Sequence, residues 1–204
     1  MSSLPGRLLD KVAIVTGSSS GLGRAIALRY AAEGAKVFCA DLEPSSRSAE
    51  EKPTTHELIK ERGGKAEFHK VDVSDAQGMK ELVNEAVKTF GRLDIMVNNA
   101  GVSFEAKTPA VLHLTEDRVW DDTMRINSRS VFLGCKHAIT QMLQQEPHQS
   151  GDRGWIVNIS SIMALISGPK NRKWHLITQN IAYTAMLFAL DTYRQQSSER
   201  QLQI

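Results

Sequence analysis

The residues with the clearest chemical potential are the glycines and serines between an apolar run and a helical pattern. The sequence Thr16-Gly17-Ser18-Ser19-Ser20-Gly21-Leu22-Gly23 directly follows the apolar residues 12–15. A buried strand, a glycine-rich turn and a helix N-terminus form a site at which an α/β sheet binds a dinucleotide pyrophosphate, because backbone N–H groups point at the phosphates. Here one glycine permits the tight turn, one lets the backbone approach the phosphates and one lets helix and strand pack closely. The residues expected to contact the cofactor are Gly17, Ser19, Ser20, Gly21, Leu22 and Gly23.

An acidic residue follows the next predicted strand. Asp41 ends the apolar run 35–40 and follows the glycine turn by about 20 residues, as the ribose-binding acid of such folds does. A carboxylate there accepts hydrogen bonds from the adenosine ribose and repels a 2′-phosphate. The turn carries serines and no basic residue, so NAD is favoured over NADP. The alternative is a solvated acid that begins a turn.

Two further polar groups follow predicted strands. Asp72-Val73 comes after the run 66–71, and Asn98-Asn99-Ala100-Gly101 comes after the run 93–97. Ligands of open α/β sheets bind at the carboxyl ends of the strands, so we expect both groups to lie near the glycine turn. On the residues alone, Asp72 can equally cap a helix and the two asparagines can simply form a turn.

The alternation of strand and helix patterns predicts how these residues are positioned. Helices on both faces of a parallel sheet follow from such an order, so the predicted fold is α/β: a Rossmann-type, doubly wound parallel sheet in three α/β/α layers. Thr54 or Thr55 is expected to cap the second helix, with Glu57 nearby, and Ser74 or Asp75 to cap the third. Strands are expected at 12–16, 35–40, 66–71, 93–97 and 154–159, and helices at 22–33, 54–62, 74–90, 116–144 (with or without an interruption) and 178–196.

Composition narrows the class of protein. The 204 residues are 41% hydrophobic and 24% charged, which is typical of one globular domain. A net charge of +2 gives no indication of nucleic acid or an anionic membrane as a partner. No apolar run is long enough to span a membrane, and the N-terminal residues lack a secretory leader pattern. Cys39 and Cys135 lie in apolar patterns and are expected to be buried thiols, rather than a disulfide or zinc ligands. We therefore expect a cytoplasmic protein with a small-molecule substrate and no metal site.

The glycine spacing G-x-x-x-G-x-G, followed in order by Asp72-Val73 and Asn98–Gly101, resembles the short-chain dehydrogenase/reductase family over residues 11–168. The resemblance implies an NAD(P)-dependent oxidoreductase that interconverts a secondary alcohol and a ketone by hydride transfer. It implies an adenine contact for Asp72 and Val73 and a structural role for Asn98. It also places Asn99, Ala100 and Gly101 along the cofactor and makes a homo-oligomer possible.

The same resemblance supplies candidate catalytic residues. Asn127 matches the family's asparagine, which holds a water in a proton relay, although such a residue can simply bond to backbone or water. Ser161 matches the family's catalytic serine, which polarises the substrate carbonyl or orients the alcohol. Because Ser160 is adjacent, the register is open by one residue, and a serine after a strand is also a common turn former.

The sequence departs from the family pattern at the remaining catalytic pair. The family places a lysine four positions after its tyrosine, on the same helix face, where the ammonium lowers the pKa of the phenol. Here Tyr183 is the candidate, position 187 is a leucine, and no lysine follows Lys173. A phenol with a pKa of about 10 is a poor base at neutral pH. Tyr183 can therefore also be an ordinary helix residue.

This departure sets the predicted domain boundary and leaves the function open. Residues 1–168 are predicted to form the dinucleotide-binding domain, and residues 169–204 a divergent C-terminal helix and tail of the same domain, so that the sheet is C-terminally incomplete. One hypothesis is an active oxidoreductase. The other is a catalytically impaired truncated or splice-variant homologue that binds cofactor or an intact partner subunit. A product that fails to fold is a third possibility, and the substrate is not defined by the sequence.

Overall fold

The computed structural model describes residues 6–45, 52–104 and 112–160, which contain one parallel sheet. Its strand order is β3-β2-β1-β4-β5, and every neighbouring pair is parallel. The chain runs outward from β1 to β3 and then returns to β4, so the strand order reverses between β1 and β4. That reversal is the place where open α/β sheets bind ligands. The strands are β1 (Val12–Thr16), β2 (Lys36–Asp41), β3 (Lys65–Lys70), β4 (Ile95–Asn98) and β5 (Trp155–Asn158).

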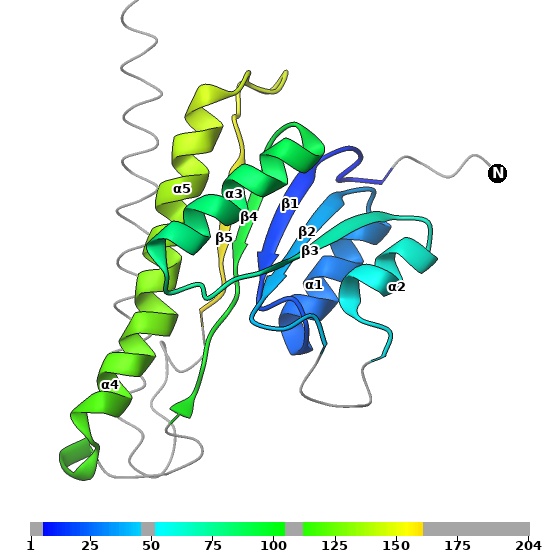
Figure 1. Cartoon of the computed structure of the whole chain (residues 1–204). Helices are drawn as coiled ribbons and strands as arrows, with labels where there is room; N and C mark the ends of the chain where they lie inside the picture. Colours follow the sequence, from blue (N-terminus) through cyan, green and yellow to red (C-terminus); the bar gives the residue numbers. More distant parts are fainter. Residues whose placement is uncertain (1–5, 46–51, 105–111, 161–204) are drawn as a thin grey trace, which may run out of the picture.

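Helices cover both faces of the sheet, which confirms the predicted three layers (Figure 1). One face packs against α1 (Gly21–Ala32) and α2 (Thr55–Glu61). The other packs against α3 (Ala76–Phe90) and α5 (Ser130–Gln144). The segment before α5 contains η2 (Leu112–Leu114), α4 (Asp117–Met124) and η3 (Arg125–Arg129), a π-helical turn that interrupts the helix expected over 116–144.

The central strand β1 is packed against helices on both of its faces. Ile14 packs into the cluster beneath α3 and α5, whereas Ala13 and Val15 pack toward α1 and α2. All of the apolar side chains of β1 are fully buried. A strand buried on both faces must be apolar at every position, which is the continuous run seen in the sequence.

Capping residues resolve the alternatives at two helix starts. Thr54, and not Thr55, is the N-cap of α2, and its N–H donates to the Glu57 carboxylate at 3.0 Å. Thr55 is instead buried and donates to the Ser18 carbonyl at 2.7 Å. Asp75 caps α3 by accepting from the Gly78 N–H at 2.7 Å. Predicted and observed bounds of the strands and of the first three helices differ by at most two residues.

Buried side chains fasten β4 to β5 and to α5. The Asn98 amide donates to the Asn158 side-chain oxygen at 2.7 Å, so Asn98 holds the two strands together, in agreement with its expected structural role. Both cysteines are buried and free. Burial raises the pKa of Cys39 to about 12 and also raises that of Cys135, so both are unreactive thiols at neutral pH.

Gly134 allows α5 to approach β4, and its replacement by alanine is expected to destabilise the fold. A Cβ at Gly134 would lie 1.9 Å from the Asn98 side-chain oxygen. Helix propensity alone favours alanine, but the collision should cost about 2 kcal/mol of unfolding free energy. Urea unfolding of Gly134→Ala beside the exposed control Lys136→Ala measures this. A Gly134→Ala chain as stable as its parent would contradict the close approach.

Candidate cofactor-binding site

The glycine turn between β1 and α1 has the backbone geometry that its spacing predicts. Gly17 and Gly21 have φ values of 66° and 52°, in the left-handed region that favours glycine. A Cβ at Gly23 would lie 2.1 Å from the Gly17 carbonyl oxygen, so this glycine permits contact between turn and helix. Next to Gly21 the space is open to at least 4 Å. The turn is therefore tightly packed at Gly17 and Gly23 and has free space beside Gly21.

The N-terminus of α1 is suited to an anion. The helix begins at Gly21, has Ser20 as its N-cap and has no acidic residue in its first turn. The partial positive charge of the helix N-terminus is thus not offset by a nearby carboxylate of the same turn. The turn offers room, N–H groups and a favourable dipole to a phosphate group.

Hydrogen bonds join the carboxyl ends of β1 and β4 beside this turn. The buried Thr16 hydroxyl oxygen accepts from the N–H groups of Asn99 and Ala100 at 3.0 and 3.1 Å. The Asn99 side-chain amide in turn donates to the Thr16 carbonyl at 2.8 Å. Asn99 is therefore fixed in place, and the segment Asn99–Gly101 lies against the glycine turn.

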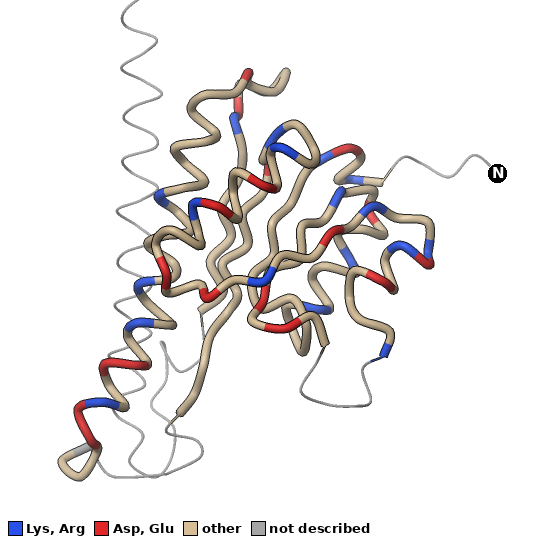
Figure 2. Tube along the Cα trace, in the orientation of Figure 1, with Lys and Arg blue, Asp and Glu red and all other residues tan. Residues whose placement is uncertain are grey.

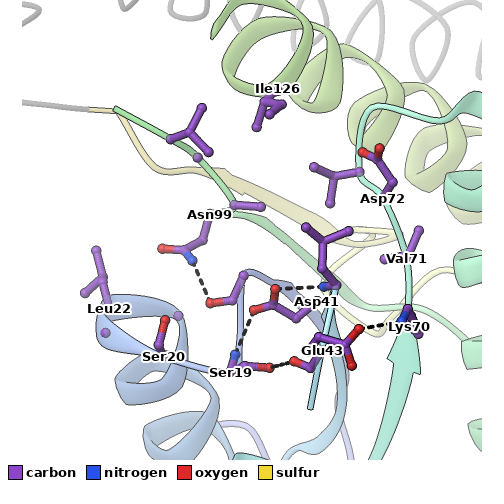
Figure 3. A pocket seen from close by; sticks show the side chains of 18 of the residues that line it. Ser19, Ser20, Leu22, Asp41, Glu43, Lys70, Val71, Asp72, Asn99 and Ile126 are labelled. Atoms are coloured by element: carbon purple, nitrogen blue, oxygen red, sulfur yellow. Dashed lines mark hydrogen bonds and ion pairs between the residues drawn. The ribbon is translucent and has the colours of Figure 1, made fainter. Parts of the chain in front are cut away.

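The carboxylate of Asp41 closes the turn onto the end of β2 (Figure 3). It accepts from the Ser19 N–H at 3.0 Å and from the Leu42 N–H at 2.8 Å. Asp41 is half-buried, so it is more than a solvated acid at the start of a turn. Carboxylate oxygens have further lone pairs, so the same group can still accept hydroxyl donors from a ligand.

A lysine that the sequence interpretation missed lies at the same edge of the cavity. Lys70 pairs in register with Asp41 across β2 and β3, and its ammonium lies 2.5 Å from the Glu43 carboxylate. Its position could have been inferred, because residues that end adjacent parallel strands lie side by side. A basic group thus stands near Asp41, although the glycine turn itself has none.

Asp72 is held by its own loop and by η3. Its Oδ1 accepts from the Ser74 N–H at 2.9 Å and from the Ser74 hydroxyl at 2.7 Å. An Arg125 nitrogen lies 3.5 Å from its other oxygen. Partial burial opposes ionisation, but the Ser74 hydrogen bonds and the charge of Arg125 outweigh it and hold the pKa of Asp72 below its ordinary value. Asp72 does not cap α3, since Asp75 does.

Asn127 lies in η3 and makes two bonds to the segment that follows β4. Its side-chain oxygen accepts from the Val102 N–H and its amide donates to the Val102 carbonyl, both at 2.8 Å. This is the backbone-bonding alternative considered for a polar residue at this position. Its role in a proton relay remains a prediction. Ser161 and Tyr183 lie outside the described residues, while the adjacent Ser160 is exposed at the end of β5.

These features surround one cavity of about 710 Å³ at the carboxyl ends of the strands. Every cofactor-contacting residue expected from the sequence lines it, and Figure 3 shows Asp41, Asp72 and Asn99 around it. The expected residues are Gly17, Ser19, Ser20, Gly21, Leu22, Gly23, Asp41, Asp72, Val73, Asn99, Ala100 and Gly101. The sequence interpretation missed Leu42, Glu43, Ser45, Lys70, Val71, Val102 and Ile126, which also line the cavity.

Other kinds of site find little support in the described part of the chain. Within it, no cluster of three or more histidine, cysteine or acidic side chains is arranged to hold a metal ion. No helix among residues 6–45, 52–104 and 112–160 has the length and apolar character needed to cross a membrane. Acidic and basic residues are interspersed along the trace (Figure 2).

Comparison with known proteins agrees with this geometry. The family model of short chain dehydrogenases matches residues 11–174. The chain is 32% identical over 183 residues to 3beta-hydroxysteroid dehydrogenase 2 of Eggerthella lenta, covering 90% of this chain and 62% of that protein. It is 37% identical over 161 residues to 2-(R)-hydroxypropyl-CoM dehydrogenase of Xanthobacter autotrophicus, covering 79% of this chain and 60% of that protein. The chain thus spans less than two thirds of the length of either relative.

Solved structures show the same similarity. A short-chain dehydrogenase/reductase from Burkholderia xenovorans superposes with a TM-score of 0.72 at 33% identity, over 86% of this chain and 66% of that one. A short chain dehydrogenase from Mycobacterium smegmatis, at 24% identity and a TM-score of 0.73, supports the fold over 89% of this chain and 70% of that one. With the switch-point cavity, its glycine turn and the family model in agreement, the chain belongs to the short-chain dehydrogenase/reductase family of oxidoreductases.

Proposed function

We propose that the chain binds NAD and interconverts a secondary alcohol and a ketone by hydride transfer. The observation that carries the proposal is the cavity at the strand-order reversal, which gathers every cofactor-contacting residue expected from the sequence. Relatives named as dehydrogenases of hydroxyl-bearing compounds support the reaction type. A nicotinamide cofactor would supply the hydride acceptor or donor, and the chain's own residues would bind and orient it.

The proposed roles follow from where each group lies. N–H groups of the turn at Ser19–Leu22 would hold the pyrophosphate, and Asp41 the adenosine ribose. Asp72 and Val73 would contact the adenine. Asn99, Ala100 and Gly101 would lie along the remainder of the cofactor, on the backbone that Thr16 fixes.

Proton transfer would rest on residues assigned by the family pattern. Ser161 would polarise the substrate oxygen and Tyr183 would exchange a proton with it, without a lysine four positions later. Asn127 would keep the segment after β4 in place through Val102. A cytoplasmic location and a homo-oligomer are part of the same proposal, as is a domain boundary near residue 168.

The preference for NAD rests on the balance of charge at the end of β2. The Asp41 carboxylate would repel a 2′-phosphate, and the nearby Lys70 ammonium is already paired with Glu43. Because the Lys70 charge is offset by Glu43, the negative charge of Asp41 should dominate where the adenosine ribose would lie. NADH should therefore bind more tightly than NADPH.

Nicotinamide fluorescence titration tests this preference, with NADH expected to bind about tenfold more tightly than NADPH. Asp41→Asn retains an acceptor for a backbone N–H but removes the charge, so the preference should fall to near parity. Asp10→Asn makes the same change of charge before β1 and should leave the ratio unchanged. Equal binding by the parent chain would contradict the NAD preference, whereas no binding of either would contradict the dinucleotide site itself.

Turnover is tested separately from binding. With NAD and a panel of secondary alcohols, the parent chain should produce NADH, which is measured by its absorbance. The panel includes hydroxysteroids and 2-hydroxyalkyl compounds. In the reverse reaction, the chain should reduce the matching ketones and consume NADH. Saturable NADH binding with no turnover across the panel would contradict the oxidoreductase proposal while leaving the cofactor site intact.

A further inference from the structure

The π-helical turn η3 borders the cavity through Ile126 and is bonded to the two loops that follow β3 and β4. Ile126 lines the cavity, and its neighbours in the sequence are Arg125 and Asn127. On one side Asn127 bonds twice to Val102, in the segment after β4. On the other side Arg125 reaches Asp72, in the segment after β3. One turn of helix therefore connects the loops that follow two non-adjacent strands of the sheet.

The contacts of η3 with the loop after β3 converge on Ser74. Arg125 donates to the Ser74 hydroxyl, and Arg129 donates to the Ser74 carbonyl at 3.2 Å. The Ser74 hydroxyl itself donates to the Asp72 carboxylate. Arg125 thus acts on Asp72 in two ways, by its charge and through the hydroxyl that it orients.

The charges around Asp72 determine what this arrangement does. The described groups that face it are the Ser74 N–H and hydroxyl of its own loop and the Arg125 guanidinium from η3. Asp122 of α4 lies 3.5 Å from the other terminal nitrogen of Arg125 and competes for its charge. Partial burial raises the pKa of Asp72, but the two Ser74 hydrogen bonds and, after them, the charge of Arg125 lower it below its ordinary value. An ionised carboxylate accepts hydrogen bonds and cannot donate one.

We propose that Arg125 is a positioning residue of the cofactor site, which orients the Asp72 carboxylate, directly and through Ser74, for the adenine end of the dinucleotide. This inference rests on the proposed dinucleotide binding, and it adds a residue that lies outside the glycine turn and the strand ends. Asn127 of the same turn also bonds to Val102, so η3 contacts both the loop after β3 and the loop after β4. Both side chains of the Arg125–Asp72 pair are about half-exposed, at 46% and 50%, so the expected effect is moderate.

The test uses ADP-ribose, which carries the adenine half of the cofactor and no nicotinamide, with binding followed by calorimetry. Arg125→Gln is expected to weaken ADP-ribose binding about fivefold at neutral pH. Arg125→Lys keeps the charge and should recover part of the loss. Nicotinamide mononucleotide serves as the second probe, and its binding should be unchanged, because Asp72 lies at the adenine end.

A pH series separates positioning from general destabilisation. A carboxyl whose pKa is lowered in the folded protein favours binding above that pKa, and binding falls as pH drops through it. Arg125→Gln moves this pKa up toward the ordinary aspartate value of about 4, so in a series from about pH 6 down to about pH 3 its loss of ADP-ribose binding should begin at higher pH than in the parent. Circular dichroism at each pH establishes that the chain is folded.

Ser74→Ala provides a second variant outside η3, which removes the hydroxyl that accepts from Arg125 and donates to Asp72. It should weaken ADP-ribose binding and shift the same pH profile in the same direction. A folded Arg125→Gln chain with the parent's affinity and pH profile would overturn the role of Arg125 while leaving dinucleotide binding in place. Failure of the parent to bind NADH or ADP-ribose would instead overturn the proposed function.

Discussion

Replacing Gly23 by alanine is expected to abolish useful dinucleotide binding and to destabilise the chain. Gly23 lies in the first turn of α1, where alanine would ordinarily favour a helix by about 1 kcal/mol. Its Cβ would, however, lie 2.1 Å from the Gly17 carbonyl and 2.5 Å from the Asn99 amide. Both neighbours are parts of the fixed framework, since the Asn99 amide also bonds to Thr16. The helix start must therefore move away from the turn.

That movement would separate the N–H groups of the turn from the other groups that line the cavity. We expect NADH affinity to fall by at least about 30-fold, which corresponds to about 2 kcal/mol, with a similar loss of unfolding free energy. Fluorescence titration and urea unfolding measure the two quantities on one preparation. Gly63→Ala controls for a glycine replacement away from the cavity, since Gly63 does not line it and nothing lies within 4 Å of an added Cβ. Its φ of 79° is strained for alanine, so this control should lose about 1 kcal/mol of unfolding free energy but keep the parent's NADH affinity. Should Gly23→Ala be more stable than the parent, helix propensity would outweigh the contact and the packing argument would be wrong.

The glycine turn illustrates what the sequence predicts well. Its residues are contiguous, and their roles depend on local backbone geometry, so spacing alone placed Gly17 and Gly23 correctly against the strand and helix. Asp72 and Asn99 were placed by a second local rule, because each follows a strand and parallel strands end at one edge. Local pattern combined with sheet topology thus predicts the composition of the cavity wall.

Residues whose position depends on long-range packing could not be placed in the same way. Arg125 reaches Ser74 only because η3 interrupts a helix, and the predicted pattern left open whether that helix was continuous. Lys70 follows from strand register, yet its pairing with Glu43 depends on the path of the loop after β2. Asn127 was assigned by family pattern, and its two bonds to Val102 became visible only with the fold.

Asp94 is the clearest case of a residue that no sequence pattern singled out and that the fold nevertheless places at a buried junction. It lies directly before β4, at the end of the sheet opposite the cavity, and is 1% exposed. Its carboxylate accepts from the Val12 N–H at 2.8 Å, from the Arg92 guanidinium at 2.6 Å and from the His148 ring at 2.8 Å. It therefore joins the starts of β1 and β4 to the segment that precedes β5.

Asp94→Ala is expected to lower the free energy of unfolding by about 3 kcal/mol, because it leaves the buried Val12 N–H without an acceptor and Arg92 without its partner. Asp94→Asn keeps one acceptor and should lose less, and the exposed Glu61→Ala should change stability by under about 0.5 kcal/mol. NADH affinity of the folded Asp94→Ala chain should stay within about twofold of the parent, since the carboxylate lies at the far end of the strands. A loss of stability below about 1 kcal/mol would show that water replaces the carboxylate. A large loss of affinity in a chain that remains folded would show instead that the two ends of the sheet are coupled, and the separation between framework and cofactor site would have to be abandoned.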